Sequence, residues 1–304
     1  MATKKTGKLS KEGLVKDLKA LGLEYGDVVM MHSNLRALAS VKEILAAPDG
    51  GMQWLVEALR EVLGIGEADG GLLAVPTLTK CFVGYGGAAG LVWHLKKTPS
   101  RVGQITNYVR TQPDAARSDH PTHPLAAIGA RAEEFCSGHS WRDGATTFDR
   151  NGPWGHLVDW DGKVMWLGTT MQTQTMVHAL EDWMRLPYMA VEKAQVEDDD
   201  GEAKVVDILM APSGARDFYG HDSKCAVKWE TEGKYVKGKV CDADSQVMGA
   251  RDFAEWLWNA IKAEPDLLLH DPDDGDEFSN KWRQPTIDHV NALEGSWRRP
   301  ETEE

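Results

Sequence analysis

The sequence predicts an α/β protein that folds as one large domain, with helices packed on a sheet. Apolar runs at residues 27–31 and 72–75 are typical of buried strands, and residues 52–63 between them have helical periodicity. Such a strand–helix–strand unit favours two parallel strands joined by a right-handed crossover. The 304 residues, 42% of them hydrophobic, can bury a large core, and no linker divides the chain. We therefore expect one domain over residues 1–270, followed by an acidic, partly mobile segment over residues 271–304.

Helix and strand signals alternate in the N-terminal third. Ser10 can cap a first helix that Gly22 ends. The first strand runs into a polar turn at residues 32–35, and Pro76 closes the second strand. Apolar residues recur at helical spacing in both helices, namely Leu14, Leu18 and Leu21 in the first and Met52, Leu55, Val56, Leu59 and Leu63 in the second.

The later elements follow from the same patterns. Apolar runs predict two more strands, at residues 125–128 and 163–167. Residues 117–123 are polar and contain proline, which predicts a loop, and the acidic run 197–202 is typical of a solvated hairpin tip. Helices are expected at residues 103–110, 130–136, 174–185 and 250–263.

The charge balance limits the classes of partner. Lys and Arg number 34 against 47 for Asp and Glu, which leaves a net charge of −13. A surface this acidic repels nucleic acid and attracts polycations, although the same charge would also serve solubility alone. No apolar run is long enough to span a membrane, no secretory signal is apparent, and the four cysteines form no C-x-x-C pair. We expect a cytoplasmic protein with reduced thiols that binds neither nucleic acid nor membranes.

The helix expected at residues 174–185 carries the clearest candidate for catalysis. His178 lies three residues before Glu181 and four before Asp182, so both carboxylates neighbour the imidazole on one helix face. An adjacent carboxylate can fix the tautomer of a histidine and stabilise its cationic form, as a general base requires. The alternative is that these residues form the solvated face of an amphipathic helix.

The position of this helix favours a functional site. Ligands of open α/β sheets bind beyond the carboxyl ends of the strands, and the helix follows such a strand end. The turn at His32, Ser33 and Asn34 follows another strand end and can offer backbone N–H groups to a phosphate. The alternative is an ordinary turn in which Ser33 and Asn34 bond to nearby backbone.

Other common catalytic patterns are missing. His120 and His123 have no third metal ligand close in sequence, and neither H-E-x-x-H nor G-x-S-x-G occurs. The glycine-rich stretch 84–90 follows no predicted strand, so we expect a loop there and not a dinucleotide-binding turn.

Six motifs run along the chain: VMMHSNL at 29–35, LAVPTLT at 73–79, TPSRVG at 98–103, RSDHP at 117–121 with AAIG at 126–129, GKVMWLG at 162–168 and TMVHALE at 175–181. Their order and spacing resemble the aminoglycoside 3-N-acetyltransferases, the antibiotic N-acetyltransferase family. The resemblance covers roughly residues 10–270. It implies an antibiotic N-acetyltransferase-like α/β fold, a single large domain in which helices flank a central mixed sheet.

The resemblance also implies acetyl-CoA as co-substrate. The turn residues would contact its phosphates, and residues after the second and fourth strands would line its pantetheine arm and thioester. His178 with Glu181 would be the catalytic pair. Some family members carry a cysteine cluster suited to zinc, but only Cys225 and Cys241 stand in the later half here, so no metal is expected. The implied cofactor-binding residues are His32, Ser33, Asn34, Leu35, Pro76, Thr77, Thr169 and Thr175.

Three positions depart from the family pattern. Asn34 and Pro124 stand where serine is common, and Gln174 stands where asparagine often precedes the threonine. These departures bear on cofactor geometry and substrate range more than on the type of reaction.

The implied reaction is acetylation of the 3-amino group of a cationic aminoglycoside, which would confer antibiotic resistance. His178 would remove a proton while the amine attacks the thioester within a ternary complex, and a backbone N–H or Thr175 would stabilise the oxyanion. Asp182, and more weakly the acidic run 197–202, would hold the cationic substrate, and Arg117 and His120 would shape the same site.

Alternatives stay open from sequence. One is a same-family acyltransferase that acts on a different amine, and another is a route through an acetylated Cys81 or Cys136. A third is a non-catalytic protein that binds CoA or a polycation. The chain is expected to be a monomer or a homodimer.

Overall fold

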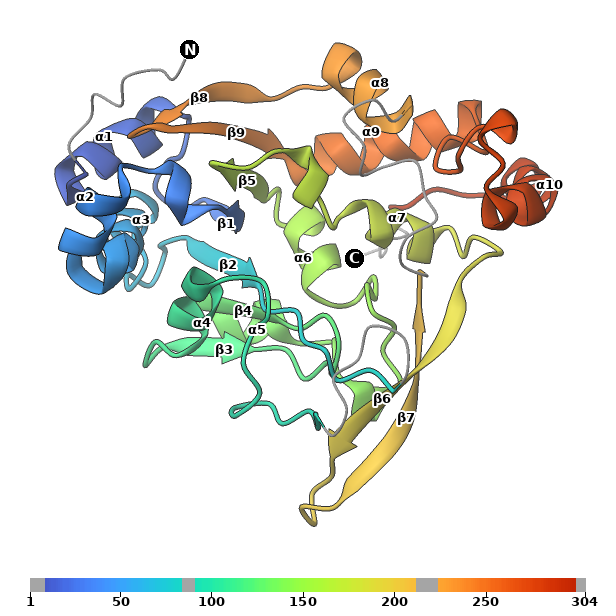
Figure 1. Ribbon diagram of the computed structural model, residues 1–304, viewed down its shortest axis with the longest axis horizontal. Helices are drawn as coiled ribbons and strands as arrows, with labels where there is room; N and C mark the ends of the chain where they lie inside the picture. Colours follow the sequence, from blue (N-terminus) through green and yellow to red (C-terminus); the bar gives the residue numbers. More distant parts are fainter. Residues whose placement is uncertain (1–8, 84–90, 212–223, 299–304) are drawn as a thin grey trace, which may run out of the picture.

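A mixed seven-stranded sheet forms the centre of the molecule (Figure 1). The computed structural model describes residues 9–83, 91–211 and 224–298. The strand order is β3-β4-β2-β1-β5-β9-β8, in which β1 is parallel to β2 and β5 and the other pairs are antiparallel. The strands of this sheet are β1 (Val28–Ser33), β2 (Leu72–Pro76), β3 (Ala115–Arg117), β4 (Leu125–Gly129), β5 (Lys163–Leu167), β8 (Val236–Val240) and β9 (Ala243–Gly249).

Strand β1 lies in the middle of the sheet, and its apolar side chains point alternately into the cores on the two faces of the sheet. Val29 and Met31 belong to the core on one side, and Met30 belongs to the core on the other. Continuous apolar runs are typical of parallel strands that helices cover on both sides. The pairing Val29↔Leu73 confirms the parallel strand–helix–strand unit predicted for residues 27–76.

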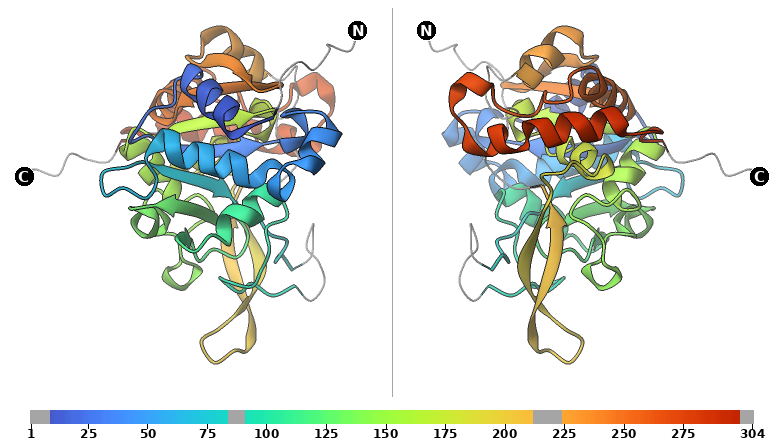
Figure 2. Two further views of the ribbon diagram at one scale, coloured as in Figure 1. Left: turned by 90° about the vertical axis from the view of Figure 1, so that its left-hand side faces the viewer. Right: turned by 90° about the vertical axis from the view of Figure 1, so that its right-hand side faces the viewer.

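Helices cover both faces of the sheet (Figure 2). On the face that receives Met31 lie α1 (Lys11–Ala20), α3 (Met52–Leu63) and α4 (Gln104–Arg110). The face that receives Met30 carries α5 (Ala132–Cys136), α6 (Pro153–Asp159), α7 (Val177–Trp183) and α9 (Ala250–Ala263). The remaining helices are α2 (Val41–Ala46), α8 (Lys224–Glu232), α10 (Glu277–Ala292) and the short 3₁₀ segments η1 (Leu35–Ala37), η2 (Pro48–Gly51), η3 (Trp141–Asp143), η4 (Met171–Thr173) and η5 (Pro272–Asp274).

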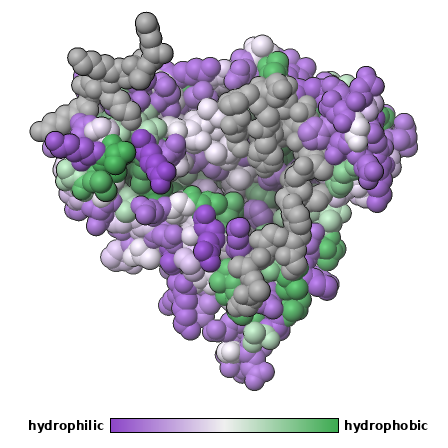
Figure 3. Space-filling view, viewed as in Figure 1, coloured by the Kyte–Doolittle hydropathy of each residue, from purple (hydrophilic) through white to green (hydrophobic). Residues whose placement is uncertain are grey.

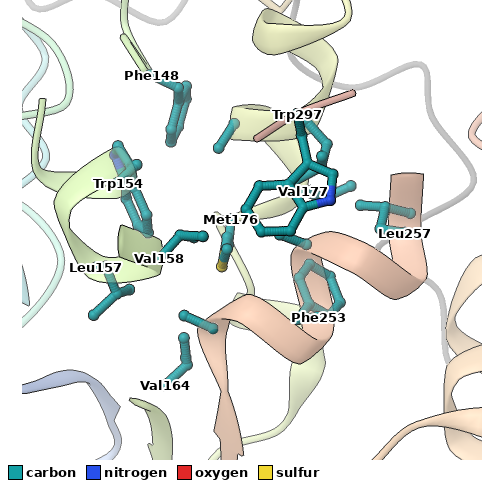
Figure 4. Close-up of a cluster of buried hydrophobic side chains, with 14 of the residues drawn as sticks. Phe148, Trp154, Leu157, Val158, Val164, Met176, Val177, Phe253, Leu257 and Trp297 are labelled. Atoms are coloured by element: carbon teal, nitrogen blue, oxygen red, sulfur yellow. The ribbon is translucent and has the colours of Figure 1, made fainter. Parts of the chain in front are cut away.

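The core beneath α6, α7 and α9 is rich in aromatic side chains. Trp154 of α6 lies beside Phe148, and Phe253 and Leu257 of α9 lie across from Met176 and Val177 (Figure 4). The C-terminal segment adds Trp297, which packs among these side chains. The start of α7 is therefore enclosed by three parts of the chain that are far apart in sequence.

A two-stranded hairpin projects away from the sheet, as both views in Figure 2 show. Its strands are β6 (Ala190–Glu197) and β7 (Ala203–Met210), and the acidic run between them forms the tip, as predicted. Isolated bridges connect Phe82 to Ala194 and Trp93 to Val196, so β6 also pairs with the segment that follows β2.

Hydrophilic side chains cover most of the face shown in Figure 3, and hydrophobic side chains gather there only in small patches. This pattern accords with a net charge of −13. Among the described residues, no helix is both long and apolar enough to cross a membrane.

Most predicted elements are confirmed within a few residues, with three differences. Helix α7 begins at Val177 and not at 174, because η4 and a turn precede it. Several elements were not expected, namely the strands β8 and β9, the short β3, and the helices α2, α6 and α8. Beyond residue 270, where we expected an acidic, partly mobile segment, the structure contains α10, whose Val290 is buried in the main core. The loop predicted at 84–90 lies outside the described residues.

Candidate active site

A cavity of about 310 Å³ opens where β1, β2 and η4 end. Four of the eight predicted cofactor-binding residues line it: His32, Ser33, Pro76 and Thr175. The other lining residues are Met31, Leu78, Val102, Thr106 and Thr173. The carboxyl ends of neighbouring strands thus form one concave site, as the α/β topology predicts.

Several polar atoms in and beside this cavity are buried without a partner. His32 Nε2, Thr175 Oγ1 and the side-chain nitrogen of Gln174 have no hydrogen-bond partner among the described residues. Burial lowers the pKa of His32 to about 4, so its imidazole is neutral near pH 7. Because an unsatisfied buried polar group is costly, atoms of this kind at a cavity indicate a ligand-binding site.

The other predicted cofactor-binding residues lie around the cavity without lining it. Asn34 accepts a hydrogen bond from the Arg36 amide at 3.2 Å, so its side chain caps the turn as the alternative interpretation expects. Leu35 packs on the core, and Thr169 is half-buried in the loop after β5. Thr77 is fully buried and donates a hydrogen bond to the Pro124 carbonyl at 3.0 Å.

His178 and Glu181 form a tight buried pair on α7. The Nδ1 atom of His178 lies 2.5 Å from Glu181 Oε2, and the side chain of His178 is 9% exposed against 0% for Glu181. Since a carboxylate oxygen accepts, Nδ1 carries the hydrogen and Nε2 is the basic nitrogen. The burial of both residues excludes the alternative of a solvated helix face.

The pair adjoins the cavity through the start of α7. The His178 amide donates to the Thr175 carbonyl at 3.1 Å, so the catalytic candidate follows one turn after a cavity-lining residue. The ring of Phe148 lies 5.3 Å from the His178 ring and covers one side of it. Tyr188, which sequence reasoning missed, donates a hydrogen bond from its hydroxyl to Glu181 Oε1 at 2.8 Å.

Asp182 is directed into the protein. Its carboxylate accepts hydrogen bonds from Arg185 at 2.8 Å and from the Phe148 amide at 3.3 Å, and the residue is 1% exposed. Burial raises the pKa of this carboxyl, which the Arg185 charge and the hydrogen bonds partly offset. The structure therefore brings Asp182 next to the catalytic candidates but does not present its carboxylate at the surface.

Arg117 connects loops around the cavity through hydrogen bonds. Its guanidinium donates to the side chain and carbonyl of Thr77 and to the carbonyls of Leu95 and Thr98. It also lies over the Trp93 ring, 4.6 Å from the ring centroid. Burial lowers the pKa of Arg117 to about 9, so the group still carries its charge near pH 7.

His120 is buried and has a defined tautomer. Its Nδ1 accepts from the amides of Thr122 and His123, so the hydrogen is on Nε2, which has no partner among the described residues. The ring stacks on His139 with centroids 4.4 Å apart. Burial, and then the neighbouring histidines, lower the pKa of His120 well below its ordinary value.

The cysteines and carboxylates form no evident second site. In the parts of the chain that the structure describes, no three His, Cys, Asp or Glu side chains form a group suited to a metal ion. Burial raises the pKa of Cys81, and raises that of Cys136 to about 12, which disfavours the thiolate that an acetyl-cysteine route requires.

Residues 30–261 match the family model for aminoglycoside 3-N-acetyltransferase. The chain belongs to this family. The match begins within β1 and includes the other six strands of the sheet and the helix that carries His178 and Glu181. The curated relatives of the family are acyltransferases by name.

Two relatives show the extent of the likeness. Aminoglycoside N(3)-acetyltransferase VIII of Streptomyces fradiae is 30% identical over 188 residues, which is 58% of this chain and 61% of that protein. Aminoglycoside N(3)-acetyltransferase VII of Streptomyces paromomycinus is 27% identical over 286 residues, 82% of this chain and 90% of the relative.

Solved structures of aminoglycoside acetyltransferases share the fold. A variant of AAC(3)-IVa in complex with a gentamicin has a TM-score of 0.74 and 24% identity, covering 92% of this chain and 98% of its own. The binary complex of AAC-IIIb with CoASH has a TM-score of 0.70 and 21% identity, covering 84% and 96%. These likenesses confirm the α/β fold with a mixed sheet flanked by helices.

Proposed function

We propose that this family member is an acetyl-CoA-dependent N-acetyltransferase that acetylates the 3-amino group of aminoglycosides and so confers antibiotic resistance. The observation that carries the proposal is the buried His178–Glu181 pair, one helical turn beyond a cavity at the strand ends. The family membership, and relatives whose names state this reaction, support the same assignment. A protein that only stored CoA would have no use for an imidazole oriented in this way.

The reaction that we propose is a direct transfer within a ternary complex. Nε2 of His178 takes a proton from the attacking 3-amine while the new N–C bond forms at the thioester carbonyl. Glu181 stabilises the imidazolium through Nδ1. The tetrahedral intermediate then expels the CoA thiolate, which takes the proton from His178. Thr175 Oγ1, buried at the cavity without a described partner, is a candidate donor to the oxyanion.

We propose that the cavity holds the pantetheine arm of acetyl-CoA. Met31, Leu78 and Val102 contribute apolar lining, and His32 and Thr175 contribute buried polar atoms. The turn at His32, Ser33, Asn34 and Leu35 would contact the phosphates, and Pro76, Thr77 and Thr169 would border the path to the thioester.

The acceptor that we propose is polycationic. The net charge of −13 attracts such a substrate, and carboxylates at residues 197–202 stand at the hairpin tip. Arg117 would act by holding the loops of the site in place, and His120 by offering its Nε2–H. Asp182 remains a candidate for the same site, through its position on the helix of His178.

Release of a free thiol tests the proposal. Purified protein is incubated with acetyl-CoA and, separately, with gentamicin, sisomicin and a panel of unrelated amines, and CoA release is followed while mass spectrometry locates the acetyl group. Rapid release with an aminoglycoside and acetylation of its 3-amine are expected. Release only with another amine would replace the substrate, and no release with any amine would eliminate the enzymatic proposal.

A further inference from the structure

Glu181 is held at both carboxylate oxygens. Oε2 contacts Nδ1 of His178 at 2.5 Å, and Oε1 accepts the Tyr188 hydroxyl hydrogen at 2.8 Å. Tyr188 lies five residues beyond the end of α7 and is 2% exposed. Its ring is thus inside the protein, with its polar end directed at the carboxylate that orients the catalytic candidate.

Helix α10 braces Tyr188 and the end of α7. The Phe278 ring packs edge-on against Tyr188, with centroids 6.0 Å apart. On the same helix, His289 Nε2 donates to the Met184 carbonyl at 2.7 Å, directly after α7. Trp297 follows α10 and packs beside Val177 at the other end of α7 (Figure 4). These contacts all come from residues beyond 261, where the family match ends.

We propose that Tyr188, held by α10, is a positioning residue that fixes the Glu181 carboxylate against His178. The inference rests on the proposed function, since positioning matters only if His178 is the base. The segment that we expected to lie outside the domain would then be a structural part of the active site.

The physical argument concerns the charge on Glu181. A donor at Oε1 restrains rotation of the carboxylate and draws charge away from Oε2, so the proton stays on Nδ1 of His178. Without this hydroxyl, more negative charge faces the imidazole, which stabilises the imidazolium. The imidazolium of His178 would then keep its proton up to a higher pH and would transfer it to the CoA thiolate more slowly.

Several other ionisable groups face this part of α7. Asp182 and its partner Arg185 lie on the same turn, Asp149 follows Phe148, His123 packs across Phe148, and His289 approaches from α10. Tyr188→Phe leaves the side chains of all these groups in place, so a change in the pH profile reports on the loss of the Tyr188 hydroxyl, whose hydrogen bond goes to Glu181.

The test compares Tyr188→Phe with the wild type. This variant keeps the ring that packs on Phe278 and loses only the hydroxyl. We expect kcat to fall about tenfold with an unchanged KM for acetyl-CoA, and the acidic limb of the kcat profile to move up by about half a pH unit or more. Tyr235→Phe, which removes an exposed hydroxyl bonded to the Glu230 carbonyl, is the matched control and should change neither.

The outcomes separate the two proposals. If the acidic limb of the kcat–pH profile does not move in Tyr188→Phe, the positioning role is overturned, whether or not kcat is lower. Should that variant fail to fold, Phe278→Leu decides by the same readout, and a limb that stays in place overturns the role equally. Wild-type turnover in His178→Ala would overturn the proposed function itself, whereas an inactive His178→Ala beside a normal Tyr188→Phe overturns only the positioning role.

Discussion

At the scale of single residues, the site depends on side chains that are buried and yet polar. His178 and Glu181 are paired at 2.5 Å, whereas His32, His120 and Thr175 keep buried polar atoms without a described partner. The paired groups can carry charge during a reaction because the partner compensates for burial. The unpaired atoms are neutral and suit contacts with a ligand.

Removal of the imidazole should abolish most of the turnover. In His178→Ala we expect kcat to fall by about 10²–10⁴-fold, the usual contribution of a general base, while the Kd for CoA stays near the wild-type value. Steady-state kinetics and calorimetry measure the two quantities. The control is His270→Ala, since the hydrogen bonds of His270 within the described residues come from its backbone. Turnover equal to that of the control would contradict the assignment.

Buried histidines should make the fold sensitive to mild acid. Burial lowers the pKa of both His32 and His139 to about 4, against 6.5 for the ordinary side chain. Between these values the unfolded chain binds protons that the folded chain refuses, so the free energy of unfolding decreases as pH falls. Each histidine contributes a loss of about 1.4 kcal/mol per pH unit in this window.

Urea denaturation at pH 7, 6 and 5 measures this loss. The variant His139→Gln lacks one of the two groups and should lose less stability over the same interval than the wild type does. An identical pH dependence in both proteins would show that His139 is already able to ionise in the folded state.

At the scale of elements, the loops after β1 and β5 meet at a glycine. Gly168 has a φ of +64°, and an added Cβ would lie 2.5 Å from the Ala37 side chain and 2.9 Å from the Asn34 carbonyl. The turn that we propose for the phosphates and the loop that carries Thr169 therefore pack so closely that a residue with a Cβ atom at position 168 would clash.

A methyl group at this position should push the two loops apart. Gly168→Ala is expected to destabilise the fold by about 1–3 kcal/mol and to raise the KM for acetyl-CoA. Gly201→Ala at the hairpin tip is the control, because its φ of +81° imposes the same strain while no atom lies within 4 Å of an added Cβ. Thermal melting and kinetics compare the variants, and equal KM values would argue against close packing of the loops at the cofactor.

The agreement between the elements predicted from the sequence and those in the structure also differs from element to element. Helix α9 matches its predicted range of 250–263, because its apolar spacing and glycine start are local signals. Helix α10 contains Pro285 and few apolar residues, so its burial arises only from contacts with distant segments. The candidate catalytic pair could be predicted because its members are three residues apart on one helix. Tyr188 contacts Glu181 from the loop after α7, and Arg117 contacts Thr77, which lies 40 residues earlier in the chain. No spacing rule predicts such contacts.

At the scale of the whole molecule, the acidic charge and the overall fold act together. The chain carries a net charge of −13, and on the face shown in Figure 3 hydrophobic side chains gather only in small patches. Long-range attraction of this kind acts on any polycation and is screened by salt over about 10 Å at 0.1 M.

Salt should therefore affect the two substrates differently. We expect the KM for a polycationic aminoglycoside to rise as sodium chloride increases from low to physiological concentration, because screening weakens the attraction. Acetyl-CoA is an anion, and its KM should not rise in the same way. Kinetics at several ionic strengths measure both, and an aminoglycoside KM that does not respond to salt would show that surface charge plays no part in capture.

The placement of the cysteines has a practical consequence for every assay of this protein. Cys81, Cys136 and Cys225 are buried and Cys241 is only partly accessible. A chromogenic disulfide reagent present during turnover will therefore react with the CoA set free and scarcely with the native enzyme. The colour can be followed continuously, and a sudden increase in its background would signal that the protein has begun to unfold.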